Sequence, residues 1–161
     1  MFPVSVQFNN LAEADVAIKA VKAMRDGIPY LMRDEEGARN TADAGLTKRL
    51  VEALSYPDND GIKSSLIETL FAAPASEWVA YPTMVEAAAK QVQMTKEDSA
   101  RRTPAALRDL SWQVKQKVDP TDLSGKQKAI EVLAERIRSG GAFSYRLTPA
   151  GRRAAEIWLL G

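Results

Sequence analysis

Cysteine and histidine are both absent from the 161 residues of this chain. Without cysteine there is no disulfide framework and no thiol nucleophile, and without histidine the commonest general base is missing. The usual zinc ligands are missing for the same reason. Ser-His-Asp and Cys-His catalysis are therefore excluded, and no group of carboxylates, lysines or tyrosines converges on a site. We expect a protein that is not an enzyme and that needs no metal or cofactor.

Long apolar runs and a secretory leader are missing as well. No stretch approaches the roughly 18 apolar residues that a membrane-spanning helix needs. The N-terminus, MFPVSVQFNN, lacks the basic start and apolar core of a signal peptide. The hydrophobic fraction of 45% is typical of a soluble globular protein. We expect a cytoplasmic protein without a membrane partner.

The chain has little net charge, +1, but the charge is unevenly distributed. Residues 1–89 contain 8 Lys and Arg against 13 Asp and Glu, a balance of −5. Residues 90–161 contain 14 against 8, a balance of +6. The basic second half could form a surface that faces phosphate groups. Alternatively, the two halves neutralise each other where they touch.

Three short motifs suggest ligand sites and fail on inspection. Glu35 and Glu36 are adjacent carboxylates with no third ligand placed to complete a metal site. The segment 56–61 resembles part of a calcium loop, but Tyr56 stands where the first Asp belongs. Gly125-Lys126 lacks the upstream glycine and the following Ser or Thr of a phosphate-binding loop. We interpret all three as ordinary loop or turn segments.

The first third of the chain alternates between two types of pattern. Period-two alternation and helical spacing predict a strand, a helix, a second strand and a second helix over 4–8, 11–24, 28–32 and 41–55. The turn-forming cluster at 56–61 is the best candidate boundary. We therefore expect a β-α-β-α extension over 1–56 and a second domain over 57–161.

The middle of the chain predicts two helices separated by a short extended segment. Apolar residues recur at helical spacing from Ile62 to Phe71. An extended patch follows over 78–81, in which we expect Trp78 to pack against the helices. A helix over 83–92 follows, with Pro82 in its first turn, where the missing N–H costs nothing.

A longer helix is predicted over 104–118, with Thr103 as its N-cap because proline disrupts a helix interior. Residues 95–102 then form an elaborated turn, and the alternative is one kinked helix from residue 96. Leu107, Leu110, Val114 and Val118 share the face predicted to be buried.

The opposite face of this helix is basic and contains one tryptophan. Arg108, Trp112, Lys115 and Gln116 lie on it, and Arg101 joins them if the helix extends back. Arginine can pair with guanine, glutamine with adenine, and lysine with phosphate. The alternative is a solvated charged face. Trp112 argues against that alternative, although it could instead pack on residues 119–141 or on a second subunit.

The last third of the chain predicts a helix, a strand and a final helix. Residues 119–122 break the chain, and we expect a helix from Ser124 to Arg138 with Ile130, Leu133, Ala134 and Ile137 on its buried face. A turn at 139–141 precedes a strand over 142–147. Thr148 caps the last helix, whose apolar end, Ile-Trp-Leu-Leu at 157–160, either docks on the core or forms a dimer contact.

The order helix, short strand, helix, turn and basic helix resembles the winged helix-turn-helix proteins of bacteria and phages. EWVAYPTMVEAAAK is similar to their strand and second helix, ALRDLSWQVKQ to their recognition helix, and AFSYRLTPAGRR to their wing strand and the helix after it. The resemblance covers residues 62–153. It implies a mainly α fold with a small β component (α+β), in which a winged-helix core follows the N-terminal β-α extension and contains a helical insertion at about 119–141.

The resemblance also implies a function. We expect a sequence-specific double-stranded DNA-binding protein, a bacterial or phage transcriptional regulator, that inserts the helix over 104–118 into the major groove. The alternative is a winged-helix module that binds protein, such as a phage-encoded inhibitor or adaptor of a host complex. A continuous basic face would favour the DNA hypothesis. The candidate DNA-binding residues are Arg101, Arg102, Arg108, Trp112, Lys115, Gln116, Arg146, Arg152 and Arg153.

Overall fold

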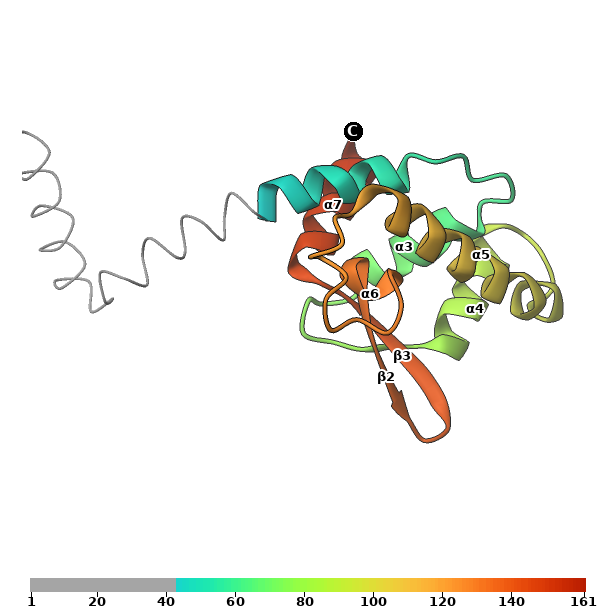
Figure 1. The fold of residues 1–161 in the computed structure, drawn as a ribbon. Helices are drawn as coiled ribbons and strands as arrows, with labels where there is room; N and C mark the ends of the chain where they lie inside the picture. Colours follow the sequence, from blue (N-terminus) through green and yellow to red (C-terminus); the bar gives the residue numbers. More distant parts are fainter. Residues whose placement is uncertain (1–42) are drawn as a thin grey trace, which may run out of the picture. The chain divides into compact units, whose positions relative to one another are not determined.

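A computed structural model describes residues 43–161 of the chain (Figure 1). The two strands and the first helix predicted before residue 33, and the carboxylates Glu35 and Glu36, lie outside the described residues. The described part is mainly helical with one small antiparallel sheet, which agrees with the predicted α+β class. An unlabelled helix over 43–54 comes first. The labelled helices are α3 (Ile62–Ala72), α4 (Tyr81–Gln91), α5 (Lys96–Lys117), α6 (Ile130–Leu133) and α7 (Pro149–Leu160).

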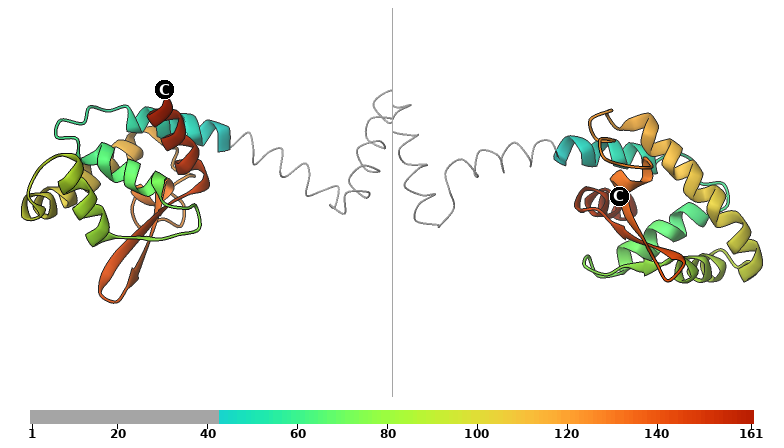
Figure 2. Two further views of the ribbon diagram at one scale, coloured as in Figure 1. Left: turned by 180° about the vertical axis from the view of Figure 1, so that it is seen from behind. Right: turned by 60° about the horizontal axis from the view of Figure 1, so that its bottom comes forward.

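Three strands form the sheet in the order β1-β3-β2. β1 is Val79–Ala80, β2 is Ala134–Ser139 and β3 is Ala142–Leu147. β2 and β3 pair along their full lengths, and the end of their hairpin projects beyond the helices (Figure 1 and the left view of Figure 2). Gly140 and Gly141 connect them with φ angles of 59° and 83°. A type I′ hairpin turn requires positive φ at both of these positions, and glycine adopts it without steric cost.

The helices and the sheet share one hydrophobic core. Ile62, Leu66 and Ile67 of α3 and Met84 of α4 are buried in it. Leu50, Ala53 and Leu54 of the helix over 43–54 are buried in the same core. Residues 43–161 accordingly form one compact unit. The domain boundary predicted at residues 56 and 57 therefore falls inside this unit, because the helix that precedes it contributes to the core.

Helix α5 runs uninterrupted from Lys96 to Lys117 and contains Pro104. The Thr95 hydroxyl accepts the Asp98 backbone N–H at 3.1 Å, so the helix begins there. The Thr103 hydroxyl donates to the Ser99 carbonyl at 2.8 Å and caps nothing. The separate helix predicted from residue 104 is therefore wrong, and the single helix from residue 96 is correct. The exposed position of Pro104 lets its ring point away from the core.

The helix predicted from Ser124 to Arg138 is also wrong. Residues 119–129 form turns, α6 has only four residues, and β2 follows it directly. The apolar spacing of Ile130, Leu133 and Ala134 fits a helix, but pairing with β3 satisfies the backbone of β2 and overrides local propensity. The helical insertion predicted at about 119–141 is thus replaced by a short helix and the first strand of a hairpin.

The start of α7 follows the prediction. The Thr148 hydroxyl accepts the Gly151 N–H at 2.9 Å, and Pro149 occupies the first turn. The helix over 43–54 lies beside α7 in both Figure 1 and Figure 2, and Asp43 is 3.9 Å from Arg153. None of the helices within residues 43–161 has the length and apolar character that crossing a membrane requires.

Candidate functional site

A groove with a volume of about 810 Å³ lies between α5, the segment before α6 and the β2–β3 hairpin. One face of α5 forms its helical wall. The residues of this wall recur every three or four positions along α5, which places them on one side of the helix. They are Pro104, Leu107, Arg108, Ser111, Trp112 and Lys115.

The hairpin supplies the other wall through the alternation of its side chains. Arg136 is paired with Tyr145, and Arg138 with Phe143, so these four residues lie on one face of the sheet. The same face carries Leu147, which is buried in the core. The face is therefore covered by the core at one end and becomes exposed toward the turn. Arg136, Phe143 and Tyr145 line the groove.

The groove is positively charged. Arg108, Lys115, Lys128 and Arg136 line it, and no carboxylate does. Ion pairs within residues 43–161 involve Arg136 but none of the other three cations. The positive charge of these three side chains is thus available to a ligand.

The two tyrosines that line the groove add no negative charge. Burial raises the pKa of Tyr145; the nearby Arg136 charge opposes this rise and the Glu131 charge adds to it. Burial raises the pKa of Tyr81 as well, with a further contribution from Tyr145. Both hydroxyls therefore stay protonated and neutral at physiological pH.

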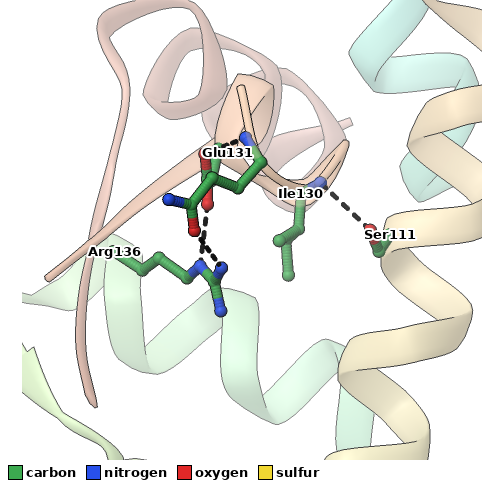
Figure 3. Close-up of polar contacts among 5 residues, drawn as sticks. Ser111, Ile130, Glu131 and Arg136 are labelled. Atoms are coloured by element: carbon green, nitrogen blue, oxygen red, sulfur yellow. Dashed lines mark hydrogen bonds and ion pairs between the residues drawn. The ribbon is translucent and has the colours of Figure 1, made fainter. Parts of the chain in front are cut away.

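Arg136 is fixed in place by its neighbours (Figure 3). Its Nε donates to Glu131 Oε1 at 2.7 Å, and its terminal nitrogen donates to Gln127 Oε1 at 3.1 Å. The Gln127 backbone N–H donates to the other Glu131 oxygen at 3.0 Å. The Ser111 hydroxyl of α5 accepts the Ile130 backbone N–H at 3.2 Å, which connects α5 to the start of α6. Figure 3 shows this bond beside the Arg136 cluster.

The groove also contains exposed aromatic rings. Trp112 is 55% exposed and Phe143 is 37% exposed. The Trp112 ring meets the edge of Tyr56, with centroids 5.9 Å apart and planes at 66°. Its contact with Tyr56 leaves more than half of the side chain open, so Trp112 does not pack on residues 119–141 as a covered core residue would.

The structure divides the nine residues predicted to contact DNA into separate groups. Arg108, Trp112 and Lys115 line the groove. Gln116 is exposed on α5 but is not among the lining residues. Arg101 and Arg102 line a different hollow, which contains Asp58, Asp60 and Asp109. Arg101 is also paired with Asp98. The acidic surroundings of the second group make it a poor anion site.

The three arginines near the hairpin and α7 have partners within the chain. Arg153 lies 3.9 Å from Asp43 of the helix over 43–54. Arg146 pairs with Glu135 at 2.7 Å, and its guanidinium lies 4.3 Å from the centre of the Trp78 ring. Trp78 was predicted to pack against the helices, but the contact that the structure shows is with Arg146 of β3, on the sheet face opposite the groove. Arg152 donates to the Ala73 and Phe71 carbonyls, both at 2.9 Å. Its guanidinium is used to connect α7 to the end of α3.

Among the charged and aromatic residues of the groove, sequence reasoning missed Tyr81, Lys128, Arg136, Phe143 and Tyr145. The cations had a signal, because Lys126, Lys128, Arg136 and Arg138 make that stretch basic. A helix was expected there, so the sequence did not predict that Arg136 lies on a strand. A two-residue Gly-Gly turn between alternating segments was the signal for the hairpin that brings Arg136 and Phe143 to the groove.

Metal binding has no visible basis in residues 43–161, which contain no group of three or more acidic side chains placed to hold an ion. Comparison with known proteins found no protein-family model, no curated protein and no solved structure that matches the chain. The geometry and charge of the groove are therefore the basis for assigning it a function.

Proposed function

We propose that the chain is a winged-helix protein that binds double-stranded DNA, and that it acts as a bacterial or phage transcriptional regulator. The observation that carries the proposal is the groove beside α5, which four cations line and no carboxylate does. DNA carries about one negative charge per 1.7 Å of its axis, so a ligand of this kind complements such a surface.

The order of the elements also supports the winged-helix proposal. From α3 to β3 the order is helix, short strand, helix, long helix, four-residue helix and hairpin: α3, β1, α4, α5, α6, then β2 and β3. A helix was predicted from the sequence where a wing needs its first strand. In this proposal β2 is that strand. In this proposal α5 is the recognition helix and the β2–β3 hairpin is the wing.

In the proposed complex, the exposed face of α5 enters the major groove. Arg108 reaches a guanine edge or a phosphate, Lys115 neutralises a phosphate, and Gln116, one position further on, can pair with adenine. Lys128 holds a backbone phosphate beside the wing, while Arg136 stays paired with Glu131. Arg146 and Arg152 maintain the fold through their partners within the chain.

The test is the affinity for a fluorescein-labelled random 24-base-pair duplex, measured by anisotropy at two salt concentrations. The wild-type chain should bind, and its affinity should fall with salt at a logarithmic slope of about −3 if Arg108, Lys115 and Lys128 each neutralise one phosphate. The double variant Arg108→Glu/Lys115→Glu should lose more than tenfold in affinity and show a shallower slope, because two of the three cations are gone.

Lys90→Glu, with a second reversal at Lys48→Glu, is the matched control. These lysines are exposed, lie on α4 and on the helix over 43–54, and do not line the groove. The control changes the net charge by the same amount and should keep most of the affinity. Equal losses in both double variants would reject the groove as the DNA site, and no binding at low salt would reject the regulator proposal.

A second function is favoured by one observation. Trp112 is 55% exposed on the face that would meet a ligand, and an exposed aromatic residue is typical of a protein-binding hot spot. In this alternative the groove holds a segment of a partner protein, and the chain acts as an inhibitor or adaptor. Binding would then depend weakly on salt, whereas phosphate neutralisation makes it depend steeply.

A further inference from the structure

We infer that the groove between α5 and the hairpin also binds an unpaired nucleic-acid strand, with a base stacked on Trp112 and its phosphates held by Arg108, Lys115 and Lys128. This inference uses the same groove as the proposed function and specifies a second form of its ligand. It explains a feature that duplex binding leaves unexplained, namely the exposed aromatic surface among the cations.

The argument begins with the position of Trp112 on α5. Arg108 precedes it by four residues and Lys115 follows it by three, so both cations lie next to it on the same side of the helix. The strand of a nucleic acid alternates phosphates with bases. A row of cation, aromatic ring and cation therefore matches a phosphate, a base and a second phosphate.

The openness of the Trp112 ring is the second step. The contact with Tyr56 is an edge contact at 66°, and the side chain remains 55% exposed. A planar ring open to solvent offers a stacking surface to any base, because every base has a π face. In an intact duplex the bases are stacked on each other and cannot use it.

The opposite wall favours the same ligand. The guanidinium of Arg136 lies 5.0 Å from the centre of the Phe143 ring, and that of Arg138 lies 5.8 Å from it. Arg136 stays paired with Glu131, so Arg138 is the cation of this wall that can pair with a phosphate, and the partly exposed Phe143 ring can contact a base. The absence of carboxylates from the groove lining removes the repulsion that a polyanion would otherwise meet.

The test uses the full chain with Trp78 and Trp158 changed to Phe, so that Trp112 is the remaining tryptophan of the three. The probes are a dT12 oligomer, a 12-residue abasic strand that has the phosphates without the bases, and the 24-base-pair duplex. We expect dT12 to quench Trp112 fluorescence and to bind more tightly than the abasic strand. The abasic strand should leave the fluorescence unchanged.

Variants at Trp112 test the stacking directly in the otherwise wild-type chain. Trp112→Ala should lower the affinity for labelled dT12 by about fivefold or more, whereas Trp112→Phe, which keeps a ring, should lose less. Circular dichroism melting of both variants checks that they are folded, which the exposure of Trp112 leads us to expect.

Several results would overturn the inference. Equal affinities for dT12 and the abasic strand would show that charge alone binds the strand, and an unchanged affinity in Trp112→Ala would show that the ring takes no part. Displacement of dT12 by dTMP at equal nucleotide concentration would indicate a nucleotide site instead of a strand site. Binding of the duplex without binding of dT12 would reject the inference and keep the proposed function. Binding of dT12 without binding of the duplex would reject the proposed function and keep the inference.

Discussion

Gly151 shows how one residue can control a contact between two elements. It is buried in the first turn of α7, and a Cβ atom placed on it would lie 1.9 Å from the Leu133 carbonyl oxygen. The same carbonyl accepts the Thr148 backbone N–H at 3.0 Å. Because the obstacle is backbone, it cannot rotate away as a flexible side chain would. The close approach of α7 to the end of α6 therefore requires glycine here.

We predict that Gly151→Ala lowers the free energy of unfolding by about 3 kcal/mol or more, at the upper end of the range for overpacking. The measurement is the urea midpoint at constant slope. Gly45→Ala is the control: Gly45 lies inside the helix over 43–54, and its added Cβ would be 3.5 Å from an Arg49 terminal nitrogen. This change should raise stability by up to about 1 kcal/mol, because alanine is the better helix former. If Gly151→Ala and Gly45→Ala had equal free energies of unfolding, the close approach of Gly151 to the Leu133 carbonyl would be contradicted.

At the scale of elements, Glu131 connects α6 to both the preceding turn and β2. Burial by itself would raise the pKa of this carboxyl. The hydrogen bonds from Arg136 and from the Gln127 and Lys128 backbones, together with the Arg136 charge, outweigh that effect and leave the pKa below its ordinary value. The Arg136 side chain is only 13% exposed, so the pair is shielded from salt.

The lowered pKa gives a stability contribution with a defined pH dependence. A carboxyl that is more acidic in the folded state stabilises the fold fully above its unfolded pKa, and this contribution disappears as the pH falls through the lowered folded pKa. We predict that Glu131→Gln lowers the free energy of unfolding at pH 7 by about 1.5 to 3 kcal/mol, the range for charged hydrogen bonds.

Urea titrations at pH 7, 5 and 3 check this prediction. The difference between the wild type and Glu131→Gln should persist at pH 5 and shrink at pH 3, where the wild-type carboxyl is increasingly protonated. Glu97→Gln on α5 offers a comparison, since Glu97 is exposed and takes part in none of these contacts. If the stability difference between the wild type and Glu131→Gln grew as the pH fell, stabilisation of the ionised Glu131 carboxylate would be refuted.

At the scale of the whole molecule, the apolar end of α7 lacks cover within residues 43–161. Ile157 is 52% exposed and Leu160 is 76% exposed, while Trp158 and Leu159 pack against the core. The predicted helix end is thus divided: one side docks on the core and the other faces outward. Ile157 also borders a hollow between α7 and the helix over 43–54, lined by Val51 and Ala44.

We predict that this outward side is a contact between two copies of the chain, as a regulator that binds two half-sites would need. Light scattering coupled to size-exclusion chromatography should give a dimer for the wild type and a monomer for Ile157→Lys/Leu160→Lys. A control with two added lysines in the exposed loop, Thr121→Lys/Ser124→Lys, should remain dimeric. A wild-type monomer at all accessible concentrations would reject the dimer.

The sequence by itself determined the helices whose boundaries are marked by local chemistry. Thr148 and Pro149 marked the start of α7, and the spacing of Leu110 and Val114 identified the buried side of α5. The start of α5 at Thr95 agreed only with the alternative prediction of one helix from residue 96. The exposed side with Arg108, Trp112 and Lys115 followed from the same periodicity. These features depend on residues within one or two helical turns, which are readable from the chain.

Only the tertiary structure decided the other wall of the groove. The stretch 130–138 has helical apolar spacing, yet 134–139 is a strand because β3 satisfies its backbone hydrogen bonds, and this pairing joins residues on either side of a Gly-Gly turn. The pairing turned Arg136 and Phe143 toward α5 and Arg146 toward Glu135 and Trp78 on the opposite face. The positions of charged residues along the chain do not identify such partners. An arginine is available to a ligand only where the fold leaves its guanidinium without an acidic or carbonyl partner.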